Sequence, residues 1–185
     1  MEVLKIKREK NYKMRIAIGI TGTSGALLSN RAIELLYEKH DLCVMATENG
    51  SRAFFLESGC RLYDFLRRKP GVVKPDNSDV LRFSSSAGTD IDRLLLLPCS
   101  TPAIGKIATG SADSSLGQLA SLMIQRRRLT VCVSCPTPDA ITLGNLAGLA
   151  SLGVTVCMLP QICGDTDTKY LDSCLQTVFS ASDIN

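Results

Sequence analysis

Hydroxyl groups, amides and small residues gather in four short segments of the chain. Residues 19–26 (GITGTSGA) can turn tightly into a helix, because small residues allow close backbone turns, and the N–H groups at a helix start can hold a phosphate. Residues 47–50 (TENG), 84–89 (SSSAGT) and 98–103 (PCSTPA) offer further hydroxyls and amides. Brought together, these segments suit a ligand that carries a phosphate and a polar heterocycle.

The glycine spacing of the first segment distinguishes between a mononucleotide and a dinucleotide ligand. Residues 19–26 do not match the dinucleotide fingerprint G-x-G-x-x-G. After the second predicted strand, Glu48 is the only acidic residue at the position that would hold a ribose. The pattern therefore predicts a mononucleotide rather than NAD. The alternative for residues 19–26 is a tight turn that binds no anion.

Short aliphatic runs alternate with longer amphipathic runs along the chain. Strands are predicted over residues 15–20, 42–46, 94–97, 129–133 and 154–159. Helices are predicted over residues 26–39, 52–57, 62–67, 139–152 and 168–180, and one more starts at Asp113 or Ser114 and ends at Arg127. This alternation predicts an α/β fold with three αβα layers and a doubly wound, mostly parallel sheet, Rossmann-like or flavodoxin-like. Ligands bind beyond the carboxyl ends of such strands, where the four polar segments lie.

Length and composition bound the class of protein. The 185 residues fit one domain, so we expect a tail over residues 1–13 and a single domain over residues 14–185. No apolar run approaches the roughly 20 residues of a membrane-spanning helix, and residues 1–13 lack the apolar core of an export signal. We expect a cytoplasmic protein without a membrane partner. The net charge of +3 gives no reason to expect a nucleic-acid partner.

Two motifs, in this order, resemble those of the flavin prenyltransferases. Residues 21–26 (TGTSGA) resemble the TGASGA loop of that family, and PCST followed by ATG within residues 98–110 resembles its PCST and ATG segment. The likeness covers about residues 14–160, and the same superfamily contains flavin-containing cysteine decarboxylases. It implies an FMN cofactor, a small-molecule substrate, and assembly as homotrimers or dodecamers with flavin near the subunit interfaces.

The resemblance also directs attention to particular residues. The residues expected to contact FMN are Thr21, Gly22, Ser24, Thr47, Ser86, Ser100, Thr101 and Gln118. Glu57 falls on a glutamate that the family uses near the reacting flavin. Glu57 and Ser24 are therefore predicted to be catalytic.

Several positions depart from the prenyltransferase pattern. Gln118 and Gln125 stand where that family carries an arginine and a lysine for the prenyl phosphate. Residues 134–138 (SCPTP) replace the R-E-x-P segment, and residues 161–165 (QICGD) replace a tyrosine. A phosphate dianion without charge-assisted hydrogen bonds loses the stronger class of contact. We therefore expect FMN-dependent redox or decarboxylation chemistry, with NAD(P)H, ferredoxin or a partner flavoprotein as electron donor.

Two alternatives remain open. The chain is a genuine flavin prenyltransferase, making prenylated FMN for a partner decarboxylase, if Lys106, Arg127 or Lys169 holds the phosphate instead. It is a non-catalytic, flavin-binding oligomeric module if it shows no turnover with any reductant or thiol substrate.

Three cysteines are candidates for a thiol cluster at the flavin. Cys99, Cys135 and Cys163 each follow a different predicted strand at its carboxyl end. If they converge, cysteine chemistry replaces the lost arginine, glutamate and tyrosine, so Cys135 and Cys163 are predicted to be catalytic. The alternative is that these thiols pack as small hydrophobic groups. Residues 163–165 (CGD) also resemble the C-G-D of phosphopantothenoylcysteine decarboxylases.

The remaining cysteines and the single histidine are expected to have structural roles. Cys132 and Cys135 form a lone C-x-x-C whose sulfurs point to opposite faces of a straight strand, so no metal site is expected. Cysteine decarboxylases use a histidine and a P-x-x-N motif, but residues 98–103 contain no asparagine. His40 lies between the first predicted helix and the second predicted strand, and we expect it at the surface.

Overall fold

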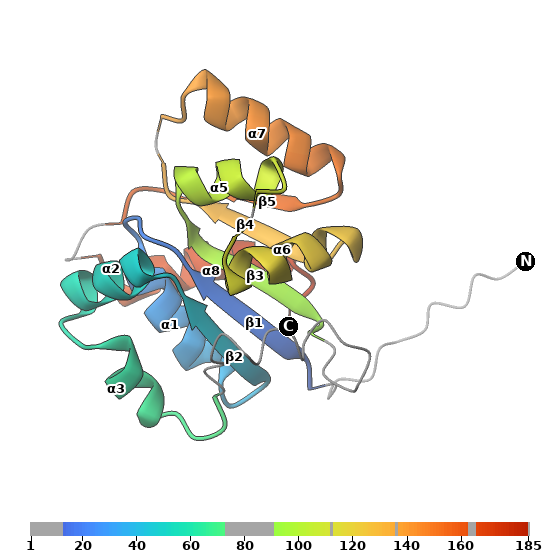
Figure 1. The fold of residues 1–185 in the computed structure, drawn as a ribbon. Helices are drawn as coiled ribbons and strands as arrows, with labels where there is room; N and C mark the ends of the chain where they lie inside the picture. Colours follow the sequence, from blue (N-terminus) through green and yellow to red (C-terminus); the bar gives the residue numbers. More distant parts are fainter. Residues whose placement is uncertain (1–12, 73–90, 112, 136, 163–165, 185) are drawn as a thin grey trace, which may run out of the picture.

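A five-stranded parallel sheet forms the centre of the molecule (Figure 1). The computed structural model describes residues 13–72, 91–111, 113–135, 137–162 and 166–184. The strands are β1 (Arg15–Ile20), β2 (Asp41–Ala46), β3 (Arg93–Cys99), β4 (Leu129–Val133) and β5 (Thr155–Met158). They run in the order β2-β1-β3-β4-β5, and every neighbouring pair is parallel. This is the flavodoxin-like strand order, which confirms the predicted doubly wound fold.

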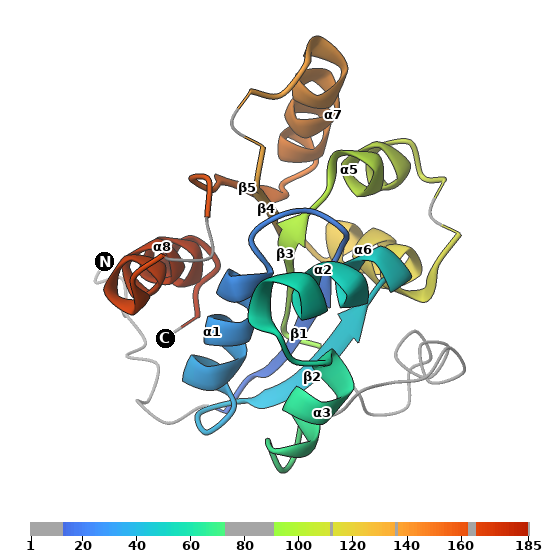
Figure 2. The same ribbon diagram turned by 90° about the vertical axis from the view of Figure 1, so that its left-hand side faces the viewer.

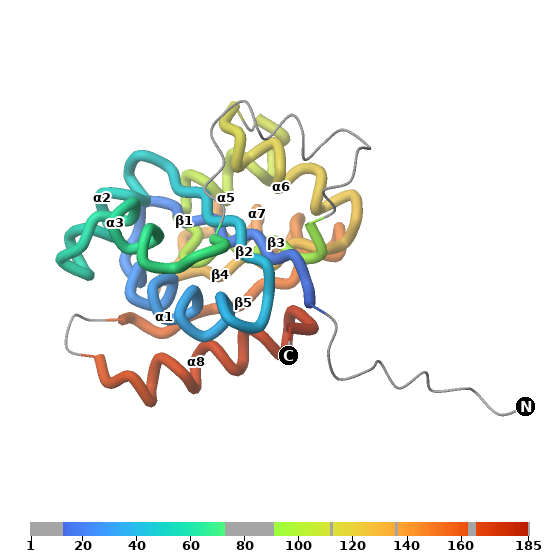
Figure 3. The backbone as a smooth tube through the Cα atoms, turned by 90° about the horizontal axis from the view of Figure 1, so that it is seen from below, coloured from blue at the N-terminus to red at the C-terminus, as the bar shows by residue number. Residues whose placement is uncertain are grey.

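Helices cover both faces of the sheet (Figures 1 and 2). On one face lie α1 (Ala26–Leu36) and α8 (Thr168–Ala181), and the buried residues of α2 (Glu48–Ser58) and α3 (Leu62–Arg67) join the same apolar cluster. On the other face lie α5 (Thr101–Ala108), α6 (Ser115–Gln125) and α7 (Ala140–Ser151). Figure 3, which looks from below, shows α8 and α6 on opposite sides of the strands.

The sequence of β1 shows why two separate cores form. Successive side chains of a strand point to opposite faces, so Ile16 and Ile18 pack in the cluster under α1 and α8, whereas Ala17 packs in the cluster under α5 and α6. β3 supplies Leu94 and Leu95 to opposite clusters in the same way. A strand buried on both faces is continuously apolar, as β3 is.

The start of α2 differs from the prediction. This helix begins at Glu48, four residues before the predicted start, because the Thr47 hydroxyl accepts a hydrogen bond from the Gly50 N–H and caps the first turn. The segment read as a loop over residues 47–50 is therefore mostly helical. The other predicted boundaries lie within about three residues of those observed, and Gly153, just after α7, has the positive φ (87°) that is common at helix ends.

His40 is not at the surface, which corrects the prediction. It is 6% exposed, and its Nδ1 accepts a hydrogen bond from the Met14 N–H at 3.3 Å. The backbone N–H of Asp41 bonds to the Met14 carbonyl in the same region. The histidine therefore packs at the amino ends of β1 and β2, opposite the edge of the sheet where ligands bind in this fold.

Within the described part of the chain, no helix is both long enough and apolar enough to cross a membrane.

Candidate functional site

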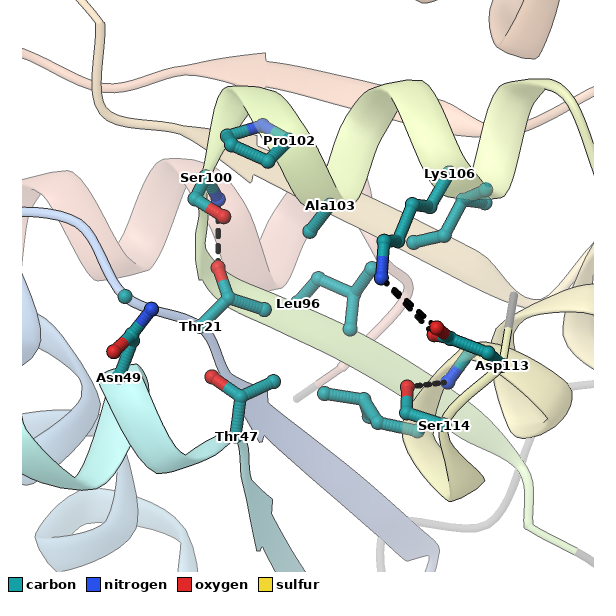
Figure 4. A pocket seen from close by; sticks show the side chains of 14 residues that line it. Thr21, Thr47, Asn49, Leu96, Ser100, Pro102, Ala103, Lys106, Asp113 and Ser114 are labelled. Atoms are coloured by element: carbon teal, nitrogen blue, oxygen red, sulfur yellow. Dashed lines mark hydrogen bonds and ion pairs between the residues drawn. The ribbon is translucent and has the colours of Figure 1, made fainter. Parts of the chain in front are cut away.

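A cavity of about 270 Å³ lies at the carboxyl ends of β1, β2 and β3 (Figure 4). Thr21 and Gly22 follow β1, Thr47 follows β2, and Ser100 follows β3. The chain order reverses between β1 and β3, and ligands bind at this switch point in doubly wound sheets. The cavity is therefore the candidate ligand site.

Three helices begin at this cavity. The N-cap residues Thr47 of α2, Ser100 of α5 and Ser114 of α6 all line it. A helix start carries a partial positive charge and N–H groups without partners inside the helix. Three such starts pointing at one cavity favour a ligand that is anionic or rich in hydrogen-bond acceptors.

The Thr21 hydroxyl joins the β1 and β3 tips. Its Oγ1 donates to the Pro98 carbonyl at 3.0 Å and accepts from the Ser100 N–H at 2.6 Å. The Thr21 N–H also donates to Pro98 O at 3.2 Å. Thr21 is 2% exposed, so its hydroxyl is occupied in fixing the loop that carries Ser100. We read Thr21 as a residue that positions the site.

Two glycines allow the β1 tip and α2 to touch. A Cβ on Gly22 would lie 2.3 Å from the Asn49 Cβ, and a Cβ on Gly50 would lie 2.2 Å from the Ile20 carbonyl oxygen. No side chain fits at either position without moving the backbone. This close approach brings Asn49 to the cavity wall.

An ion pair stands at the other end of the cavity. The Lys106 Nζ donates to both carboxylate oxygens of Asp113 at 3.1 Å, and both residues line the cavity. The hydrogen bond from Lys106 holds the pKa of the Asp113 carboxyl below its usual value. Figure 4 shows this pair separated from Thr21, Thr47 and Ser100 by the apolar side chain of Leu96. The cavity thus has a neutral hydrogen-bonding end and a charged end.

Glu57 lies at the start of α1 rather than in the cavity. Its carboxylate accepts from the Gly25 N–H at 3.0 and 3.2 Å and from the Leu27 N–H at 3.2 Å. Two of the amides at the helix start that the sequence suggested for a phosphate are therefore occupied by a side chain of this protein. The left-handed conformation of Gly25 (φ 104°) turns its N–H toward that carboxylate.

The predicted FMN residues divide into three groups. Thr21, Gly22, Thr47 and Ser100 line the cavity. Ser24, Thr101 and Gln118 are exposed and do not line it. Ser86 lies outside the described residues. The roles of all these residues remain predictions.

The predicted thiol cluster is only partly described. Cys99 is 1% exposed, and burial raises the pKa of its thiol to about 12. Cys135 is half-buried against the same apolar cluster, and Cys163 lies outside the described residues. The buried Cys99 therefore fits the alternative, in which a cysteine packs as a small hydrophobic group.

A different pair of thiols meets within the sheet. Cys132 of β4 and Cys157 of β5 are register partners on the face under α1 and α8, opposite the face of Cys135. A hydrogen bond from the Cys132 thiol lowers the pKa of Cys157 to about 7, although burial opposes the shift. That bond and burial raise the pKa of Cys132 well above its usual value. The described cysteines are free thiols.

Four cavity residues with polar side chains, Asn49, Lys106, Asp113 and Ser114, were absent from the predicted FMN contacts. Asn49 lies in the segment 47–50 that was expected at the ligand, but only Thr47 of that segment was named as a contact, and Ser114 was considered only as a helix start. Lys106 was considered only for a prenyl phosphate, and Asp113 only as a cap. The signal for this pair was the spacing of a lysine near the end of one helix and an aspartate just before the next.

Comparison with known proteins identifies the family of the chain. The family model described as Flavoprotein matches residues 4–179. The chain belongs to this flavoprotein family. It is 29% identical over 147 residues to the flavin prenyltransferase UbiX of Chlamydia pneumoniae, covering 77% of each chain. The prediction of a flavoprotein superfamily that includes the prenyltransferases is confirmed.

Solved structures support the fold. The complex of AnUbiX (PadA1) with FMN and dimethylallyl pyrophosphate has a TM-score of 0.79 at 18% identity, with 94% of each chain covered. A dodecameric FMN-dependent UbiX-like decarboxylase from Escherichia coli O157:H7 has a TM-score of 0.79 at 22% identity, covering 93% of this chain and 96% of that one. The expectation of a flavin-dependent enzyme, its reaction class left open, agrees with these relatives.

Proposed function

We propose that the cavity at the β1/β3 switch point binds FMN and that the chain is a flavin-dependent enzyme. The main observation behind this proposal is that the starts of three helices, α2, α5 and α6, line one cavity together with apolar side chains. The N–H and hydroxyl groups around Thr47, Ser100 and Ser114 suit the acceptors of a phosphate and of a heterocycle. Leu96 and Leu116 offer an apolar surface to the flavin ring. The FMN bound in one similar structure and the FMN dependence of a second similar protein support the choice of nucleotide.

Each group in the cavity has a role that its contacts suggest. Thr21 fixes the β3 tip, so that the Ser100 hydroxyl and the start of α5 keep their direction toward the ligand. The Thr47 Oγ1 already accepts from Gly50, so its O–H remains a donor for the ligand. When bound, FMN would supply the electron-accepting and electron-donating chemistry. The protein would bind the flavin, orient it and exclude water.

We expect the flavin to serve redox or decarboxylation chemistry. The support is the neutral character of positions where the prenyltransferases carry cations: Gln118 and Gln125 are both exposed on α6. Arg127 and Lys169 do not replace those cations at the cavity, since Arg127 follows α6 beside Gly153 and Lys169 lies on α8. A thiol-bearing or carboxylate substrate is the expected class.

Prenyl transfer is the second candidate. It is favoured by the similarity to a flavin prenyltransferase and by one specific observation, the Lys106 ammonium in the cavity. A cation there offers a phosphate the charge-assisted contact that Gln118 and Gln125 cannot give.

One experiment separates these proposals. The absorption spectrum and the flavin mass are measured on protein purified under native conditions, and then after incubation of reduced FMN with dimethylallyl phosphate. Bound, unmodified FMN before and after incubation supports redox or decarboxylation chemistry, and a heavier flavin supports prenyl transfer. Colourless protein that does not bind added FMN rejects both. Bound FMN without turnover on any reductant or thiol substrate supports a carrier module.

We also propose that the chain assembles with copies of itself, as trimers or a dodecamer. Large apolar side chains are exposed on α2 and α7: Leu56 is 79% exposed and Ile141 is 77% exposed. α7 is apolar around most of its circumference, which is unusual for a helix that faces water on one side. The dodecameric UbiX-like relative supports this proposal. Light scattering on the wild-type protein and on Ile141→Glu should show a large assembly and a smaller one.

A further inference from the structure

The Lys106–Asp113 pair stands out because it places two charged side chains in the wall of the cavity proposed to bind flavin. Among the described lining residues, Lys106 is the single cation and Asp113 the single anion. The pair therefore leaves the charged end of the cavity neutral overall. Ser114, the N-cap of α6, lies beside it, so the partial positive charge of that helix start adds to the charge of Lys106.

The contact is easily broken. The side chains of Lys106 and Asp113 are 56% and 73% exposed, so water screens their attraction. Neither is held by a second charged group among the printed ion pairs of the described chain. Lys106 is anchored through α5, whereas Asp113 sits in the connection that precedes α6. An incoming anion can therefore replace the Asp113 carboxylate as the partner of the Lys106 ammonium without unfolding either helix.

We propose that Lys106 binds a phosphate monoester in this cavity and that Asp113 is the internal counterion that the phosphate displaces. This inference rests on the proposed function, because the cavity is taken to be the flavin site. A phosphate dianion gains a charge-assisted hydrogen bond from the ammonium, and it meets the positive start of α6 at the same end of the cavity. The phosphate belongs either to the flavin or to an alkyl phosphate co-substrate.

The first arm of the test compares FMN with riboflavin, which lacks only the phosphate. Affinities are measured by flavin fluorescence quenching on wild-type protein, Lys106→Met, Lys106→Arg and Asp113→Asn. If the flavin supplies the phosphate, Lys106→Met weakens FMN binding about tenfold or more and leaves riboflavin binding unchanged. Lys106→Arg keeps most of the preference for FMN. Asp113→Asn strengthens FMN binding about two- to fivefold, since the competing carboxylate is gone.

The second arm titrates dimethylallyl phosphate into FMN-loaded protein. If the co-substrate supplies the phosphate, Lys106→Met leaves both flavin affinities unchanged and weakens this binding about tenfold or more. Lys169→Met is the matched control, because it removes the same charge from α8, away from the cavity. It should change none of these affinities.

Two results would overturn the inference. One is that Lys106→Met leaves the binding of FMN and of dimethylallyl phosphate unchanged. The other is that it weakens riboflavin as much as FMN, which shows that the pair only braces the connection between α5 and α6. If wild-type protein binds neither flavin, the proposed function fails, and titration of dimethylallyl phosphate alone on the same variants decides the role of Lys106 separately.

Discussion

The start of α1 and the starts of α2, α5 and α6 use the same backbone chemistry to different ends. At α1, the Glu57 carboxylate occupies the N–H groups of Gly25 and Leu27. At the other three helices the starts open into the cavity, and Asp113, the acidic residue among the described lining residues, is held by Lys106. A helix start thus stays available to an anionic ligand only where no carboxylate of the protein already accepts from its N–H groups.

The same contrast runs through the face of the sheet under α1. There, Ser29 donates to the Leu97 carbonyl and Arg31 pairs with Asp172 of α8, so the polar groups are matched within the chain. The cavity, in contrast, has donors beyond those its own acceptors use, such as the Thr47 hydroxyl. The polar groups on the face under α1 therefore maintain the fold, whereas the cavity has donors that remain available to a ligand.

The largest expected effect is a loss of stability when a side chain is added where α2 contacts the β1 tip beside the cavity. Gly50→Ala should destabilise the protein by about 2–3 kcal/mol, because the new Cβ meets the Ile20 carbonyl oxygen and pushes α2 from the β1 tip. Urea unfolding measures the loss. Gly105→Ala in α5 is the control: its Cβ meets only Asn145 at 3.7 Å, so stability should hold or rise by about 0.5–1 kcal/mol. Equal effects of the two changes would contradict the proposed close approach.

The second largest effect comes from removing the carboxylate that binds the N–H groups at the start of α1. Glu57→Ala should cost about 1–2 kcal/mol of unfolding free energy, since the start of α1 loses its acceptor. Glu57→Gln should cost less, because one oxygen can still accept. Added sulfate should raise the melting temperature of Glu57→Ala more than that of the wild type, because the vacated N–H groups can then bind an anion. Identical sulfate responses would show that Glu57 does not close an anion site.

Thiol reactivity compares Cys157 and Cys99, which pack on opposite faces of the sheet, and its expected effect is intermediate in size. The thiolate of Cys157 forms as the pH rises through about 7 and is lost as the pH falls below it. Its alkylation should therefore speed up about tenfold between pH 6 and pH 8, as measured by mass spectrometry. Cys99, whose pKa burial raises to about 12, should stay unlabelled over this range. Labelling of Cys99 ahead of Cys157 would favour the thiol cluster predicted from the sequence.

The smallest effect concerns the ion pair that joins α1 to α8. Arg31 lowers the pKa of Asp172 through a hydrogen bond, and both side chains are partly exposed. Arg31→Gln should cost only about 0.5 kcal/mol at neutral pH. This contribution is present above pH 4 and disappears as the pH falls through the lowered pKa of Asp172. A double-mutant cycle with Asp172→Asn, followed by urea unfolding at pH 7 and pH 3, measures it.

Much of the fold was predictable because it depends on local patterns. The aliphatic runs of β1, β3 and β4 and the caps at Ser114 and Asp139 lie in short stretches whose periodicity and cap residues act within a few positions. The strand tips then follow, since parallel strands end at one edge. This is why Thr21, Gly22, Thr47 and Ser100 could be expected together.

Other features of the site depend on contacts between distant residues. The sequence does not show that Glu57 reaches back to Gly25, or that Thr21 takes the Ser100 N–H across 79 positions. Tertiary contacts also give the cysteines different pKa values: burial raises that of Cys99, whereas the hydrogen bond from Cys132 lowers that of Cys157.

The sequence by itself determined the class of fold and the edge of the sheet where a ligand would bind, because strand and helix patterns are read within single elements. Only the tertiary structure decided which helix starts stay open and which thiol is acidic. Those properties depend on which side chain comes within hydrogen-bonding distance and how much water remains around it, and both are set by packing between elements.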